Sequence, residues 1–229
     1  MRGRVLWLAA VVISVPRLVW ATPFTATYSF VGQPGTEASV AIASNPTGTL
    51  FDNIIRGSGL TSISGVNSIN SEAWTTGATL DSNDYYQFAV TPQAGYDVDL
   101  SEIIFSERRS GQGVITIDLR SSLDGYASSL FLDVLPDDTL TRRFTVNLPN
   151  AFDDLAGPVT FRFFGYAAQD GRGTWRLGTA PSPDNPSNDP ANLLVIGDAA
   201  PIPEPGTMLL VVIGGGAGLW RRARRRPTR

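Results

Sequence analysis

The chain has 229 residues with no cysteine and no histidine, and all 18 of its basic residues are arginine. These absences exclude a Ser-His-Asp triad, a cysteine protease, a zinc site of nitrogen and sulfur ligands, and a lysine Schiff base. Carboxylate catalysis and calcium binding by oxygen ligands are not excluded, and no cofactor is expected.

The charge is distributed unevenly along the chain. Three arginines lie within the first 17 residues and six lie in 221–229, which leaves nine arginines against twenty acidic residues between Glu37 and Asp198, a net charge of −11. A surface of this sign repels phosphate backbones. We therefore expect no nucleic-acid partner.

Residues 1–21 have the pattern of a secretory signal peptide. A basic start is followed by an apolar run from Val5 to Val15, which is too short to span a bilayer, and then by small residues at Val19 and Ala21. Those are the two positions that a signal peptidase reads, so cleavage is predicted after Ala21. The alternative, an uncleaved anchor, conflicts with the length of the apolar run.

Residues 22–198 show short runs in which apolar and polar residues alternate, separated by turn residues such as Gly, Asn and Asp. This pattern is typical of strands. The expected strands lie within 24–30, 84–90, 98–105, 114–120, 130–134, 143–149, 159–166, 174–177 and 192–196. With about nine to eleven strands and no helix, the segment is predicted to form one antiparallel β-sandwich of the jelly-roll type.

Some aromatic residues of these strands are out of phase with the expected core. Tyr85 points away from the face that carries Tyr86, and Phe164 and Tyr166 point away from the face that carries Phe163. If solvent reaches that face, the rings could stack on sugar rings; the alternative is that loops cover the face and the rings are ordinary packing. Four further aromatic residues near turns would extend such a surface: Trp74, Tyr96, Tyr126 and Trp175.

Arg108 and Arg109 follow Glu107 at the end of an expected strand. A guanidinium group can bind a carboxylate or sulfate of an acidic sugar with two parallel hydrogen bonds. The alternative is a pair of surface ion pairs, for instance with Glu107 or Asp118.

The acidic residues allow two further functions, which the pattern does not favour. Asp137-Asp138 and Asp153-Asp154 could bind calcium, but they lack the alternating spacing of a calcium loop and are better explained as solvated turns. A glycoside hydrolase would need two carboxylates across a cleft. The nominal candidates are Asp99, Glu102, Glu107 and Asp118. No catalytic residue and no metal site is assigned.

After a linker at 199–202, the chain ends in three consecutive features. These are the triplet Pro203, Glu204, Pro205, an apolar segment at 207–220, and a basic cluster. A helix of 14 residues spans about 21 Å, against about 30 Å for the hydrocarbon core, so the anchor is weak. The basic cluster would keep the C-terminus in the cytoplasm; it consists of Arg221, Arg222, Arg224, Arg225 and Arg226.

In this order and spacing, residues 203–229 closely resemble the PEP-CTERM sorting signal of Gram-negative bacteria. The resemblance implies recognition by exosortase, a membrane transpeptidase that removes the transient anchor, and delivery of the ectodomain to the cell surface or extracellular matrix. The class is associated with exopolysaccharide and biofilm. The alternative is a plain single-pass anchor.

Two stretches, 88–128 and 161–177, look like a β-sandwich domain that recurs ahead of such signals. That resemblance implies an architecture and no activity. The sequence therefore predicts an exported, non-enzymatic protein of the cell surface or matrix, associated with exopolysaccharide. A carbohydrate-binding module is the alternative, and a carboxylate-based glycoside hydrolase is the minor one.

Overall fold

A computed structural model describes residues 20–179 and 183–202. Most of the expected signal peptide and the whole expected sorting signal lie outside the described residues. Within the described ranges, no helix is long and apolar enough to cross a membrane.

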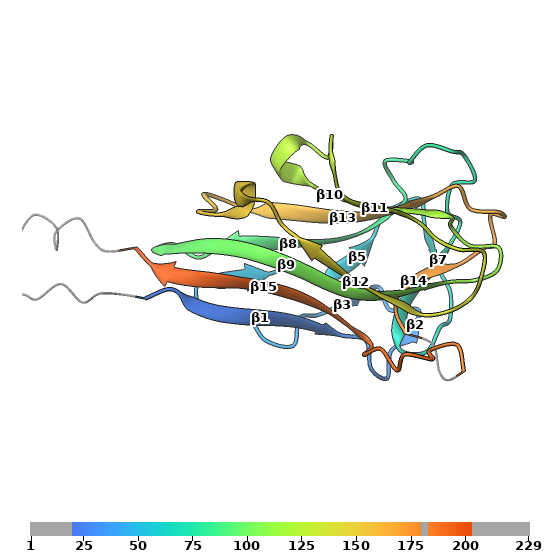
Figure 1. The fold of residues 1–229 in the computed structure, drawn as a ribbon, viewed down its shortest axis with the longest axis horizontal. Coiled ribbons are helices and arrows are strands. Elements are labelled where there is room, and N and C mark those ends of the chain that lie inside the picture. The colour runs from blue at the N-terminus through green and yellow to red at the C-terminus, as the bar shows by residue number, and fades with distance from the viewer. Residues whose placement is uncertain (1–19, 180–182, 203–229) are drawn as a thin grey trace, which may run out of the picture.

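The described residues form a sandwich of two β-sheets (Figure 1). The eight-stranded sheet has the order β1 (Thr22–Ser29), β15 (Asn192–Pro201), β9 (Tyr96–Arg109), β14 (Trp175–Gly178), β7 (Ser68–Glu72) and β2 (Pro34–Gly35), with β12 (Arg142–Asn147) on β9 and β6 (Thr61–Ser62) on β7. The seven-stranded sheet has the order β11 (Ser129–Val134), β10 (Thr116–Ser121), β13 (Val159–Tyr166), β8 (Tyr85–Pro92), β5 (Ile54–Arg56) and β3 (Ser39–Val40), with β4 (Thr49–Phe51) on β8.

The predicted all-β sandwich is confirmed. The helical elements of the described residues are two single 3₁₀ turns, η1 (Ser122–Asp124) and η2 (Asn150–Phe152). Each of the nine expected strand regions contains or overlaps a strand. One departure from antiparallel pairing occurs, because β2 runs parallel to β7. The short strands β2 to β7 had no sequence signal, since runs of two to five residues show too little alternation.

The structure corrects the expected linker at 199–202, because most of this segment belongs to a strand. Ala199, Ala200 and Pro201 continue β15 and pair with β9, and Ala199 lies opposite Thr22 of β1. The alternation of buried and half-buried residues continues to this end of the strand, which explains why pairing persists. The sandwich therefore extends to Pro201, and its first and last strands begin and end side by side (Figure 1).

Aromatic side chains fill the space between the two sheets. Phe88 of β8 stacks on Phe161 of β13 with 5.2 Å between ring centroids, and Phe161 stacks on Phe152 at 5.4 Å. Phe105 of β9, in the opposite sheet, approaches Phe163 edge to face at 4.9 Å. These contacts join the two sheets through rings that are almost fully buried.

A second aromatic cluster contains the two tryptophans that would extend the aromatic surface if solvent reached them. The Trp74 ring centroid lies 5.4 Å from that of Tyr86 and 5.2 Å from that of Trp175, and all three side chains are buried. The Tyr86 hydroxyl donates a hydrogen bond of 2.8 Å to the carbonyl of Trp175. Trp74 and Trp175 are therefore core residues, and the packing alternative is the correct one for both.

The stacked position of Phe88 allows the contribution of this core to stability to be tested. Replacing Phe88 by Ala should lower the free energy of unfolding by about 3–5 kcal/mol, because the cavity cannot close between two rigid sheets. Urea unfolding of the full-length protein measures the change. Leu132→Ala is the control, since Leu132 is 55% exposed and should change stability by less than about 0.5 kcal/mol. Equal effects of the two substitutions would contradict this description of the core.

Candidate functional site

The candidate site is the outer face of the seven-stranded sheet, meaning the face that points away from the other sheet. Strand register aligns its side chains in rows across β8, β13 and β10. One row contains Tyr85, Phe164 and Asp118, and the next contains Gln87, Arg162 and Arg120. Because side chains alternate along a strand, the same strands send their phenylalanines at 88, 161 and 163 into the core.

Arg162 lies between two tyrosine rings. The central carbon of its guanidinium group is 4.1 Å from the ring centroid of Tyr85 and 4.3 Å from that of Tyr126. Its Nε donates a hydrogen bond of 2.8 Å to Oε1 of Gln87. Cation–π attraction on both faces of the guanidinium group holds it in place. We call these three residues the Tyr–Arg–Tyr stack.

Tyr126 reaches the stack from the loop that follows β10 and η1. Its backbone has a φ of 64°, which is unusual for a bulky residue. Arg120 stabilises this conformation, because its Nη1 donates a 3.0 Å hydrogen bond to the Tyr126 carbonyl. Oδ2 of Asp118 in turn accepts hydrogen bonds from Nε and Nη2 of Arg120, at 2.8 and 2.7 Å. A local strain of this kind needs such support from its surroundings.

The aromatic residues predicted for ligand binding do lie together, but they are not equally accessible. Tyr85 and Tyr166 are half-buried, whereas Phe164 is only 2% exposed. Tyr85 and Tyr126 cover Phe164, with ring centroids at 5.8 and 6.4 Å. The packing alternative is therefore the correct one for Phe164, and solvent reaches the tyrosines that lie above and beside it.

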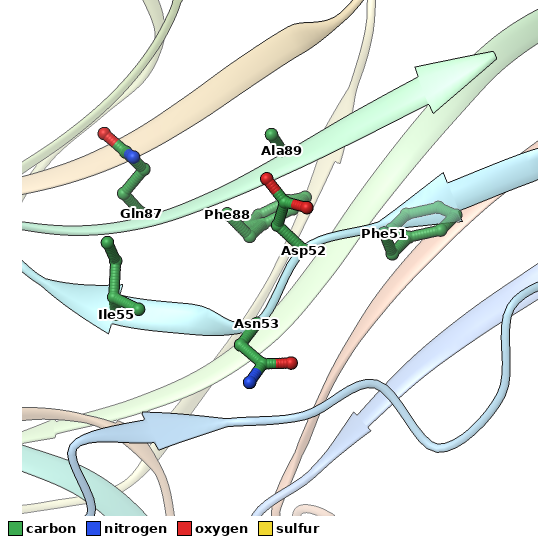
Figure 2. A pocket seen from close by; sticks show the side chains of 7 residues that line it. All are labelled: Phe51, Asp52, Asn53, Ile55, Gln87, Phe88 and Ala89. Atoms are coloured by element: carbon green, nitrogen blue, oxygen red, sulfur yellow. The ribbon is translucent and has the colours of Figure 1, made fainter.

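A pocket of about 400 Å³ adjoins the stack on the same face (Figure 2). Gln87 and Ala89 of β8 lie opposite Asp52 and Ile55 (Figure 2), whereas the Asn53 side chain points away from β8 and donates a hydrogen bond to Ser39 of β3. Phe51 and Phe88 complete its lining. Gln87 belongs to both parts of the site, because the residue that lines the pocket also accepts the hydrogen bond from Arg162.

Arg108 and Arg109 are elsewhere, at the end of β9 in the eight-stranded sheet. Arg109 is 0% exposed, and it donates hydrogen bonds to Asp137 and to backbone carbonyls, including that of Gly113. Arg108 donates to the Thr139 carbonyl and to Asp184 at 2.7 Å. Both arginines form ion pairs, as the alternative predicted, but the partners are Asp184 and Asp137 in place of Glu107 or Asp118, and Arg109 is not accessible to a ligand.

Glu107 points into the sandwich beside Arg109. Its Oε2 accepts a 2.8 Å hydrogen bond from Nε1 of Trp175, and its Oε1 lies 3.5 Å from Nη1 of Arg142. Burial raises the pKa of this carboxyl to about 7, although Trp175 and Arg142 act in the opposite direction.

The nominal hydrolase carboxylates do not share a cleft. Asp99, Glu102 and Glu107 belong to β9, whereas Asp118 lies on β10 of the other sheet, and neither Glu107 nor Asp118 is exposed. Two of the four acids considered for calcium are paired with arginines, since Asp137 binds Arg109 and Asp138 binds Arg142. In the part of the chain that the structure describes, no group of three acidic residues is arranged to hold a metal ion.

No protein-family model matches the chain, and no curated protein matches it in sequence. The solved structures that are similar include the K3 cleaved adhesin domain of Lys-gingipain from Porphyromonas gingivalis, at 16% identity over 75% of this chain and 96% of that chain, with a TM-score of 0.36. A mutant of a family 29 carbohydrate-binding module in complex with mannohexaose has 12% identity over 78% of this chain and 93% of that chain, with a TM-score of 0.36. Similarity at this level says nothing about what this chain binds.

The raised pKa of Glu107 predicts how stability depends on pH. The folded protein holds this proton up to about pH 7, whereas the unfolded chain releases it near pH 4.5, so this group makes the free energy of unfolding fall as pH rises through that window. Glu107→Gln removes the effect and keeps an acceptor for Trp175. Its stability relative to the wild type should therefore increase between pH 4.5 and 8, by on the order of 3 kcal/mol.

Urea unfolding at several pH values measures this difference. Glu102→Gln is the control, because Glu102 is half-buried on the same strand. A difference between Glu107→Gln and the wild type that stays constant with pH would show that Glu107 titrates normally.

Proposed function

We propose that this chain is an exported, non-enzymatic protein of the cell surface that binds a glycan on the outer face of the seven-stranded sheet. The observation that carries the proposal is the Tyr–Arg–Tyr stack with a pocket beside it, on one solvent-facing surface. A binding surface of this kind needs no pair of catalytic carboxylates.

The chemistry of the face suits a sugar. Tyrosine offers an apolar ring for the C–H groups of a sugar and a hydroxyl for its polar edge. The pocket supplies carboxylate and amide groups from Asp52 and Gln87, which can exchange hydrogen bonds with sugar hydroxyls. Its volume of about 400 Å³ is within the usual range for small-molecule sites.

Export and sorting complete the proposal. Signal peptidase would cut after Ala21, and an exosortase-type transpeptidase would process the C-terminal signal of an inner-membrane precursor in a Gram-negative bacterium. Two features of the fold support this: β1 begins at Thr22, immediately after the expected cut, and β15 ends at Pro201, two residues before the Pro-Glu-Pro triplet. Both processing sites would therefore leave the sandwich complete, whether it is released or attached to an exopolysaccharide matrix.

Tyrosine substitutions test the binding face. On a glycan array, Tyr85→Ala and Tyr126→Ala should each weaken binding at least about ten-fold, because each removes one ring of the stack, and a contact of about 1.4 kcal/mol accounts for that factor. Tyr96→Ala is the matched control, since Tyr96 lies on β9 in the other sheet.

Three other results would contradict the proposal. Binding that survives both substitutions would place the ligand elsewhere. No binding to any glycan would favour a purely structural role in the matrix, in which the tyrosines serve to cover Phe164. Release of reducing sugar that is lost on removal of a single carboxylate would indicate a hydrolase.

The sorting signal has its own test. Replacing Glu204 by Ala, or deleting 221–229, should leave the full-length precursor in the inner membrane, because the transpeptidase would no longer recognise the signal. Cell fractionation and mass spectrometry of the mature C-terminus measure the result, with Tyr85→Ala as a control that should be processed normally. Unchanged processing in both tail variants would refute the sorting proposal.

A further inference from the structure

We infer that the glycan bound by the outer face carries a carboxylate, as in a polymer of uronic acids, and that Arg162 binds this group. The inference rests on the proposed function and specifies its ligand. It starts from a guanidinium group that has cation–π partners but no acidic partner among the residues that the structure describes.

Among the nine described arginines, Arg172 and Arg176 also have no ion pair with a described residue, but neither belongs to the seven-stranded sheet. Arg162 differs from the other six. Four of them form ion pairs with acidic side chains: Arg108, Arg109, Arg120 and Arg142. Arg56 and Arg143 donate to carbonyl, hydroxyl or amide oxygens. Arg162 donates from Nε to Gln87, and its Nη1 and Nη2 have no acceptor among residues 20–179 and 183–202. The side chain is half-buried, so solvent reaches it.

The orientation of the guanidinium group is fixed before a ligand arrives. Tyr85 and Tyr126 hold its two faces, and Gln87 occupies its Nε–H. The remaining donors are the paired N–H groups of Nη1 and Nη2, which match the two oxygens of a carboxylate. A group immobilised in this way loses little entropy on binding.

The charges around Arg162 also favour an anion at this point. The acid in the next row of the face, Asp118, is already neutralised by two hydrogen bonds from Arg120. Asp124, in the loop that carries Tyr126, accepts hydrogen bonds from the backbone N–H groups of Ala127 and Ser128. Physiological salt screens charges that lie more than about 8 Å from Arg162.

The pocket determines how the ligand is oriented on the outer face. Asp52 is exposed and lines the pocket with Asn53, on the far side of Gln87 from Arg162. A carboxylate in the pocket would be repelled by Asp52, whereas sugar hydroxyls can donate to it. The acidic group therefore lies at Arg162, and the hydroxyl-bearing part of the sugar lies in the pocket.

The test compares polymers that differ only in their carboxylates. Polygalacturonate and alginate are each paired with a carboxyl-reduced form, in which –COO⁻ becomes –CH₂OH, and binding to the full-length protein in detergent is measured by calorimetry. We expect the wild type to bind at least one uronate polymer about ten-fold or more tightly than its reduced form. Arg162→Gln should abolish this preference, and Arg162→Lys should lose most of it, because an ammonium group has no paired donors.

Two controls make the result specific. Arg172→Gln removes an exposed arginine from the turn before β14 and should keep the preference. Tyr85→Ala should weaken binding to both members of a pair. Thermal unfolding of each variant confirms that the sandwich is intact.

The outcomes separate this inference from the proposed function. Equal binding to a polymer and its reduced form, or a preference that survives Arg162→Gln, overturns the carboxylate inference while glycan binding stands. A full preference in Arg162→Lys overturns the bidentate contact. Absence of binding to these polymers and to every glycan of the array overturns both.

Discussion

The two-residue period of β8 and β13 determines both the stability of this domain and its candidate site. On one face the period sends Phe88, Phe161 and Phe163 between the sheets, where they contact one another and Phe105 of the opposite sheet. On the other face the same period presents Tyr85 and Arg162. A shift of register by one residue would exchange the two sets, so the core holds the site in place.

The outer face becomes a site through the loop after β10. The strands alone would leave Phe164 and Arg162 with a single aromatic partner each on this face, Tyr85. The loop brings Tyr126 over both residues, and its strained backbone is held by Arg120, which is fixed in turn by Asp118. A chain of charge-assisted hydrogen bonds thus sets the position of one aromatic ring. The stack that results joins β8, β13 and this loop.

The end of β9 lies outside the candidate site and carries buried charged residues. Glu107 and Arg109 continue the inward-facing row of Ile103 and Phe105, so they place charged groups inside the sandwich. Burying charge is costly unless it is hydrogen-bonded. Nη1 and Nη2 of Arg109 donate to carbonyls of two loops, which attaches those loops to the sheet, whereas its buried Nε has no partner among the described residues. From the sequence alone, Glu107 and Arg109 are expected on the surface, because charged residues are usually exposed.

The sequence by itself determined the features that depend on neighbouring residues: the long strands, the all-β class and the outward direction of Tyr85 and Tyr166. Alternation along a strand is local, so a single chain reveals it. The tertiary structure alone decided which of those residues are accessible and what they contact. Arg162 gave no signal in the sequence, because its importance comes from Tyr85 and Tyr126, which lie far from it along the chain. The surroundings of Arg109 and Phe164 stayed open for the same reason, since the carbonyls that bind the one and the rings that cover the other come from segments that only folding brings together.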